Sequence, residues 1–374
     1  MGRVDSGIRV GGVYPAASRM PLQLRAVCEV TSLRVRHYPV ACSWGCRSIA
    51  RVRTLMSISA KIGEDAPEWY AYIKGRILGI TVIPAYRVVS TFARKAREKP
   101  YDEAAGEMER GLREYVRSLL SMLHPSISEL GERSVIAQFG DPEPEPLLEA
   151  LTQLDAGNPK EIVDETLARC SSVLSRPDLN ARAFLFPGDG ESRVLVKQMH
   201  GVLGFSLGSQ AMVVFLWPTE NWQYWLAYTA AHEYAHLVRN LMLPRSPQGG
   251  RLMYVKSQTP ETLLDAMVAE GIADHFATRM SSNPPPPWTD ALTAPQATHL
   301  WPRVRRRLEV SDMNEIRRVL FGDGDRIPTW TGYTLGYRIV NGYLQNHPAA
   351  QFGALVGLSG KAVFEGSGFP NGAG

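Results

Sequence analysis

The motif His232-Glu-Tyr-Ala-His236 restricts the fold of this 374-residue chain more than any other sequence feature. It lies in an apolar segment after Pro218 that we expect to form a helix through about Leu241. Imidazole and carboxylate groups are costly to bury unless partners or a metal ion compensate them. We therefore expect this helix to be built around a polar site.

The spacing of the two histidines fits a shared metal ion. Four residues along a helix turn the side chain by about 400°, so His232 and His236 lie about 40° apart and one turn above each other. Glu233, about 100° round the helix, can approach the open position of the metal without binding it. The pattern therefore predicts a zinc site with His232 and His236 as ligands and Glu233 as general base.

A catalytic zinc ion needs a third protein ligand beside a water molecule. We expect Glu270 to supply it from a second helix, which should begin at Thr259 and end near Arg279. Asp274 lies one turn after Glu270 on the same face. Its carboxylate is expected to accept the outward N–H of a zinc-bound histidine, which we take to be His232.

A donor beside the metal usually stabilises the oxyanion that forms during peptide hydrolysis. The last predicted helix, residues 331–346, offers Tyr333, Tyr337 and Arg338 as candidates. The two tyrosines share a helix face, although an aromatic stripe of this kind also fits a core position. We place Tyr337 slightly ahead of Tyr333 and expect His275 to be an ordinary polar residue.

The two predicted helices together resemble a known group of enzymes. A His-Glu-x-x-His helix followed by a Glu-x-x-x-Asp helix is similar to the gluzincin metallopeptidases, the thermolysin-like group. The resemblance implies a zincin-like fold and one zinc ion per chain. It implies that His232, His236 and Glu270 are the ligands and that Asp274 orients a ligand from behind.

A narrower resemblance includes the last helix. The segments His232-Glu-Tyr-Ala-His-Leu-Val-Arg, Thr262-Leu-Leu-Asp-Ala-Met-Val-Ala-Glu-Gly-Ile-Ala-Asp and Gly332-Tyr-Thr-Leu-Gly-Tyr-Arg-Ile-Val resemble the YjaZ-like predicted zinc-dependent proteases of bacteria. The similarity covers about residues 180–365. It implies a peptidase fold and metal site but no particular substrate.

The remaining pattern predicts an α+β fold. Residues 183–187, 201–207 and 211–217 read as short strands, which would form a small mixed sheet just before the motif helix. Helical periodicity marks about residues 68–123, with Ile80 among its apolar positions, and residues 161–174. Gly271 should let two helices approach closely.

We therefore expect three regions. Residues 56–180 would form a mainly helical N-terminal region, and residues 181–365 the gluzincin-like zinc peptidase domain. Residues 1–55 show no useful periodicity and are broken by glycine and proline. We expect them to be a leader outside any domain, or an extension of the gene upstream of a start at Met56.

Charge and composition exclude several classes of protein. The net charge is +4, but residues 1–55 alone hold nine Arg against Asp5 and Glu29, so the remainder is slightly acidic. No stripe of Lys and Arg marks a nucleic-acid-binding element, and no apolar run is long enough for a membrane helix. The four cysteines, including the loosely spaced Cys42 and Cys46, favour a reducing compartment. We expect a cytoplasmic protein without nucleic-acid or membrane partners.

The sequence as a whole predicts a zinc-dependent metallopeptidase whose partner is a peptide or protein substrate. Glu233 would take a proton from water and pass it to the leaving amine. Strand 201–207 could add an extended peptide to the sheet edge, or could be part of a plain buried hairpin.

One alternative is a peptide-binding protein with the same fold and little or no hydrolysis. A structural metal site fits less well, because such sites are usually closed and rich in Cys. The oligomeric state stays open.

Overall fold

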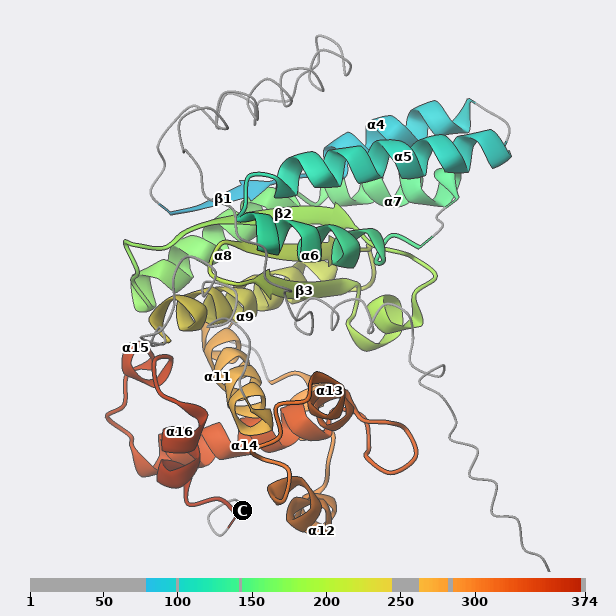
Figure 1. Cartoon of the computed structure of the whole chain (residues 1–374). Coiled ribbons are helices and arrows are strands. Elements are labelled where there is room, and N and C mark those ends of the chain that lie inside the picture. Colours follow the sequence, from blue (N-terminus) through green and yellow to red (C-terminus); the bar gives the residue numbers. More distant parts are fainter. Residues whose placement is uncertain (1–78, 99–100, 141–142, 244–261, 282–284, 371–374) are drawn as a thin grey trace, which may run out of the picture.

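The computed structural model describes residues 79–98, 101–140, 143–243, 262–281 and 285–370 (Figure 1). The described strands are β1 (Gly79–Ile83), β2 (Asn180–Pro187), β3 (Val202–Leu207) and β4 (Ala211–Leu216). The helices before the motif are α4 (Tyr86–Arg97), α5 (Tyr101–Leu120), α6 (Pro125–Ile136), α7 (Pro144–Ala156), α8 (Pro159–Val173) and the short π-helix η2 (Val194–Gln198). Those that carry and follow it are α9 (Trp222–Met242), α11 (Leu263–Ser281), the 3-10 helix η3 (Pro287–Asp290), α12 (Ala294–Arg305), α13 (Met313–Phe321), α14 (Thr331–Asn346), α15 (Phe352–Leu355) and α16 (Gly360–Ser367).

The four strands form one mixed sheet in the order β1-β2-β4-β3. β1, β2 and β4 run parallel, whereas β3 runs antiparallel to β4 and lies at the edge of the sheet. All six residues of β4 are buried, as expected for a parallel strand covered on both faces. This confirms a mixed α+β fold that is mostly helical, with a small mixed sheet before the motif helix.

The helical prediction is wrong at Ile80, which lies in β1. Short apolar runs with β-branched residues fit a helix or a buried strand equally well in sequence. Pairing with β2 decides between them, because Ile80 lies opposite Ala181 in a parallel ladder. The sheet thus includes a strand from the predicted N-terminal region, and the boundary at residue 180 stays a prediction.

Helices cover both faces of the sheet. α4 packs on β2 and also contacts α5 and α7. On the opposite side of the sheet, α9 packs against β3 and β4 (Figure 1). Phe139, which follows α6, packs edge-to-face on Phe186 of β2 and Phe215 of β4. These aromatic contacts form the centre of the core between the sheet and the N-terminal helices.

The motif helix α9 is enclosed by other elements. It follows Asn221, whose φ of 60° turns the chain sharply into the helix, and it ends at Met242, close to the predicted end. Besides the two strands it contacts α8 and α11. Buried residues are spread round α9, as expected of a helix within the core.

A buried cation joins α9 to the C-terminal helices. Arg239 donates hydrogen bonds to the backbone carbonyls of Val356 (3.0 Å) and Leu358 (2.8 Å), which lie at and just beyond the end of α15. Burial lowers the pKa of Arg239 to about 10, although the charge of Asp265 raises it in part. The guanidinium therefore stays charged and needs these two carbonyls as partners.

α11 lies between α9 and α14 (Figure 1). Its predicted beginning at Thr259 lies outside the described residues. The helix starts at Leu263, where the Thr262 hydroxyl accepts the backbone N–H of Asp265. It ends at Ser281, close to the predicted end, and α14 spans the predicted residues 331–346.

Other sequence features are quickly placed. The helix predicted at 161–174 is α8. Cys42 and Cys46 lie outside the described residues, and Cys170 is a buried free thiol. None of the described helices is long and apolar enough to cross a membrane.

Glycine permits the close approach of α11 to α14. A Cβ on Gly271 would lie 2.4 Å from the carbonyl oxygen of Gly336, and a Cβ on Gly336 would lie 1.9 Å from that of Met267. Both contacts are with backbone, which cannot move as a flexible side chain can. The predicted close approach at Gly271 is thus confirmed, and its partner is α14.

Gly271→Ala should therefore destabilise the protein, because the added methyl group forces the two helices apart. We expect a loss of about 1–3 kcal/mol in the free energy of unfolding, measured by urea denaturation. Gly106→Ala is the matched control, since a Cβ there would meet only the end of the Arg110 side chain at 3.5 Å. Alanine favours a helix interior, so the control should be neutral or stabilising. Equal stability of the Gly271 variant and the control would contradict this packing.

Candidate metal centre

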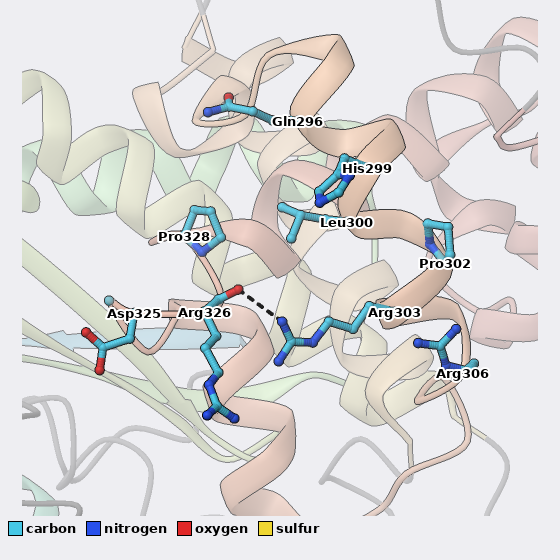
Figure 2. A pocket seen from close by; sticks show the side chains of 10 residues that line it. Gln296, His299, Leu300, Pro302, Arg303, Arg306, Asp325, Arg326 and Pro328 are labelled. Carbon is cyan, nitrogen blue, oxygen red and sulfur yellow. Dashed lines mark hydrogen bonds between the residues drawn. The ribbon is translucent and has the colours of Figure 1, made fainter. Parts of the chain in front are cut away.

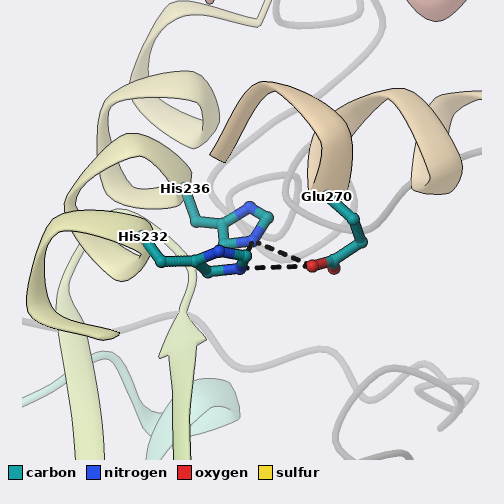
Figure 3. A group of neighbouring side chains, drawn as sticks. All are labelled: His232, His236 and Glu270. Atoms are coloured by element: carbon teal, nitrogen blue, oxygen red, sulfur yellow. Dashed lines mark hydrogen bonds and ion pairs between the residues drawn. The ribbon is translucent and has the colours of Figure 1, made fainter. Parts of the chain in front are cut away.

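Two helices bring three metal-binding side chains together. α9 supplies His232 and His236 one turn apart, and α11 supplies Glu270 (Figure 3). The two imidazole Nε2 atoms lie 3.0 Å apart, and the Oε2 atom of Glu270 lies 3.2 Å from the first and 3.5 Å from the second. These residues are positioned to bind a metal ion.

The donor set fits zinc. Ligand atoms of a tetrahedral zinc site, at bond lengths of about 2.0–2.1 Å, lie about 3.3–3.4 Å from one another. The three separations of 3.0, 3.2 and 3.5 Å bracket that spacing. Two imidazoles and one carboxylate also form the ligand type of catalytic zinc sites, which keep a fourth position for water or substrate.

Electrostatics keep the third ligand ionised. Burial alone would raise the pKa of Glu270, but the charges and hydrogen bonds of His236 and His232 lower it far below its usual range. A carboxylate must be deprotonated to bind a metal ion. Glu270 is therefore ready for binding across the physiological pH range.

Asp274 fixes the orientation of one histidine ligand. Its Oδ1 atom lies 2.9 Å from the Nδ1 atom of His232, so Nδ1 carries a proton and Nε2 is the nitrogen that would bind a metal ion once it is deprotonated. Burial lowers the pKa of His232, but the hydrogen bond and charge of Asp274, with those of Glu270, raise it well above its usual value. The negative charge of Asp274 makes this imidazole a more basic ligand.

The carboxylate of Asp274 has no exposed surface and is held by further donors. The Tyr228 hydroxyl donates to Oδ1 at 2.8 Å, and the Trp288 indole N–H lies 3.2 Å from both oxygens. Tyr228 lies one turn before His232 on α9, while Trp288 comes from η3. Hydrogen bonds from three side chains, two on α9 and one on η3, therefore compensate this buried charge.

The Glu233 side chain packs against the edge strand β3, at the position of Gly204 and Ser206. The Ser206 hydroxyl donates a hydrogen bond of 2.6 Å to its Oε2 atom. Gly204, on the same face of β3, leaves room for the side chain, because a Cβ there would lie 3.0 Å from Oε1 of Glu233 and 2.5 Å from Thr229. Glu233 is thus buried next to the two histidines without being one of the three grouped ligands.

The two candidate tyrosines of α14 lie in different surroundings. Burial raises the pKa of Tyr333 well above its usual value, and the charges of Glu270, Asp274 and Glu233 raise it further, together with a hydrogen bond to Glu270. Tyr333 is therefore a protonated donor beside the candidate ligands. Its ring packs edge-on against Trp330, with centroids 5.3 Å apart.

Tyr337 instead stacks on His275, with ring centroids 3.8 Å apart and planes 5° from parallel. The Nε2 atom of His275 lies 3.0 Å from the Tyr337 carbonyl oxygen. Arg338 ion-pairs with Asp290 at 2.9 Å and also donates to the Leu292 carbonyl. The structure thus groups Tyr333, but neither Tyr337 nor Arg338, with the candidate ligands.

Three residues of this site were missed by sequence reasoning. Tyr228 had a usable signal, because it precedes His232 by one helical turn. Ser206 and Trp288 had none, since the first depends on how β3 lies on α9 and the second on a short helix after a proline run. Such contacts between distant segments are set by tertiary packing.

Comparison with known proteins agrees with this geometry at the level of family. A family model described as "Predicted Zn-dependent protease (DUF2268)" matches residues 160–363, more than half of the chain. Searches of curated proteins and of solved structures give no match. The matched range contains the three candidate ligands and Asp274, and the chain belongs to this family.

Asp274→Asn should weaken zinc binding by about 10- to 100-fold, because the neutral amide neither supports His232 as a ligand nor satisfies three donors. The zinc dissociation constant can be measured by competition with a chelating dye. Asp265→Asn is the matched control on the same helix, since Asp265 accepts from Thr262 and the Gly360 N–H and touches no candidate ligand. Equal affinities for the two variants would show that Asp274 does not support the site.

Proposed function

We propose that this member of the family of predicted Zn-dependent proteases is a peptidase with one zinc ion held by His232, His236 and Glu270. The observation that carries the proposal is the convergence of these three donors beside Glu233, a buried carboxylate. Three protein ligands leave one position for water or substrate. The arrangement of the two helices supports a gluzincin-type site and, more narrowly, a relative of the YjaZ-like bacterial proteases.

The chemistry divides between the ion and the chain. Zinc bound at this site would lower the pKa of a water molecule and polarise a carbonyl oxygen. Glu233 would accept a proton from the attacking water and deliver it to the leaving nitrogen. Ser206 supports this role by holding one carboxylate oxygen at 2.6 Å, which leaves the other for the water.

Tyr333 would stabilise the negative charge that develops on the carbonyl oxygen of the substrate. Its pKa, raised by burial, keeps the phenol protonated, and the charge of the nearby Glu270 contributes to that rise. A donor fixed beside the reacting carbonyl is worth several kcal/mol in acyl-transfer enzymes, about 3–4 in measured cases. Between the two tyrosines, the structure therefore favours Tyr333 over Tyr337.

The edge strand β3 offers a place for an extended peptide. It ends the sheet order within the described residues, and its Ser206 contacts Glu233. A peptide that adds to this edge would make main-chain hydrogen bonds while its scissile bond lies beside the candidate base. This arrangement favours a peptide rather than a small ester or amide as the substrate.

Glu233→Gln should retain zinc and lose hydrolysis by at least about 100-fold, because the amide cannot take up the proton of water. Zinc content is measured by elemental analysis, and cleavage by mass spectrometry of a mixed peptide library. Glu220→Gln, at an exposed position just before α9, is the matched control and should cleave like the wild type. Wild-type cleavage by the Glu233 variant would exclude this residue as the base. Zinc-loaded wild type that binds peptides but cleaves none would favour the non-hydrolytic alternative.

Tyr333→Phe should lower kcat by about 100- to 1,000-fold with little change in zinc content, because only the transition state needs the hydroxyl. Tyr337→Phe, on the same helix, should stay within a few-fold of wild type, since its ring stacks on His275. The two kcat values are compared on the best substrate from the peptide library. A larger loss in the Tyr337 variant would reverse this assignment.

A further inference from the structure

A second polar site lies away from the metal centre, between α12 and the turn that precedes α14. It is a depression of about 550 Å³ (Figure 2). This volume lies within the range of small-ligand and peptide-side-chain sites. The lining residues that matter for its chemistry are His299, Leu300, Arg303, Arg306, Asp325 and Arg326.

Helix α12 forms one wall. His299, Arg303 and Arg306 follow one another at spacings of four and three, so they share one face of the helix and its C-cap. The opposite face is fixed in the core through Trp301 and Val304. The basic face of α12 is thereby held toward the depression.

The turn of residues 322–328 forms the other wall and is rigidly built. Asp323 accepts the backbone N–H groups of Arg326 (2.7 Å) and Ile327 (2.8 Å) and the guanidinium of Arg318 (2.8 Å). Burial raises the pKa of Asp323, but these hydrogen bonds lower it to about 2. The turn therefore keeps its shape over the physiological pH range.

The two walls are joined by one hydrogen bond. The Nη1 atom of Arg303 donates to the backbone carbonyl of Arg326 at 3.3 Å, as the dashed line in Figure 2 shows. This contact uses only one of the five N–H groups of the guanidinium. The remaining donors of Arg303 can serve a ligand.

Positive charge in the depression is left without acidic partners. Among the described residues, no carboxylate lies within ion-pair distance of Arg303, Arg306 or Arg326. The neighbouring Arg307 and Arg318, by contrast, both pair with Glu315. Asp325 is the one acidic residue among the described residues of the lining, which therefore carry a net positive charge.

We propose that this depression binds an acidic peptide segment. Asp or Glu carboxylates would bind Arg303, Arg306 and Arg326 through charge-assisted hydrogen bonds. The planar guanidinium group of arginine presents paired N–H donors that match the two oxygens of a carboxylate. The methylene groups of the peptide's Asp and Glu side chains would pack on Leu300 and Pro328, which also line the depression. The proposal concerns binding alone and does not depend on hydrolysis at the metal centre.

Two other ligand classes fit less well. A single phosphate ion is much smaller than 550 Å³ and makes no use of the apolar wall. Single-stranded nucleic acid is usually held by aromatic side chains that stack on its bases, and no Phe, Tyr or Trp is among the described residues that line this depression. Several carboxylates on a short peptide match both the spread of the charges and the apolar surface.

The test measures binding by fluorescence anisotropy with the full chain carrying Glu233→Gln, so that the probe is not cleaved. The probe is a fluorescein-labelled peptide with four consecutive Glu between Gly-Ser ends, compared with the same peptide carrying Gln. We expect the Glu peptide to bind at least about tenfold more tightly, with an affinity that falls as salt rises. A chelator should leave this affinity unchanged, which separates the depression from the metal centre.

Matched variants locate the binding site. Arg306→Gln and Arg326→Gln should each weaken binding of the Glu peptide by about fivefold or more, since each removes one charge-assisted contact. Arg305→Gln removes the same charge next to Arg306 but outside the lining, and should change the affinity less than twofold. All three side chains are exposed, so the variants should fold alike.

Three outcomes would overturn the proposal. The Glu and Gln peptides could bind equally, or Arg305→Gln could weaken binding as much as Arg306→Gln does. Alternatively, inorganic phosphate or a labelled oligonucleotide could bind more tightly than the Glu peptide and depend on Arg306 and Arg326. That last result would assign the depression to a phosphate-bearing ligand.

Discussion

The hydrogen bonds to the buried carboxylate of Asp274 are the interactions on which the architecture of the candidate metal centre depends. Asp274 receives hydrogen bonds from His232 and Tyr228 of α9 and from Trp288 of η3, while its own backbone belongs to α11. A charge without solvent contact is tolerated only when such donors surround it. The same contacts that satisfy Asp274 therefore fix how α9, α11 and η3 lie relative to one another.

Close packing within the core holds the helices that carry the candidate ligands. α9 is packed between the sheet and α11, and α11 lies against α14 through Gly271 and Gly336. Groups on rigid, close-packed helices keep their geometry better than groups on loops. The same packing positions Tyr333, because α14 lies against α11, the helix that supplies Glu270.

Sequence reasoning succeeded where geometry is local and failed where it is not. The spacing of His232 and His236 fixes their relation within one helix, and Glu270 and Asp274 follow the same rule on the next. Strand β1 was misread because its pattern is ambiguous until it pairs with β2. Ser206 reaches Glu233 only through the placement of a strand on a helix, and no spacing in the chain encodes that contact.

The hydrogen bonds of Arg239 connect the motif helix α9 to the C-terminal part of the chain. This guanidinium lies one turn beyond His236, and its partners are two carbonyls more than a hundred residues later. Removing the chain from α15 onward would take away both carbonyl acceptors of this buried cation and the segment that covers it. The C-terminal segment is thus structurally part of the region that holds the candidate ligands, and a shortened chain that keeps all three of them would have a less stable motif helix.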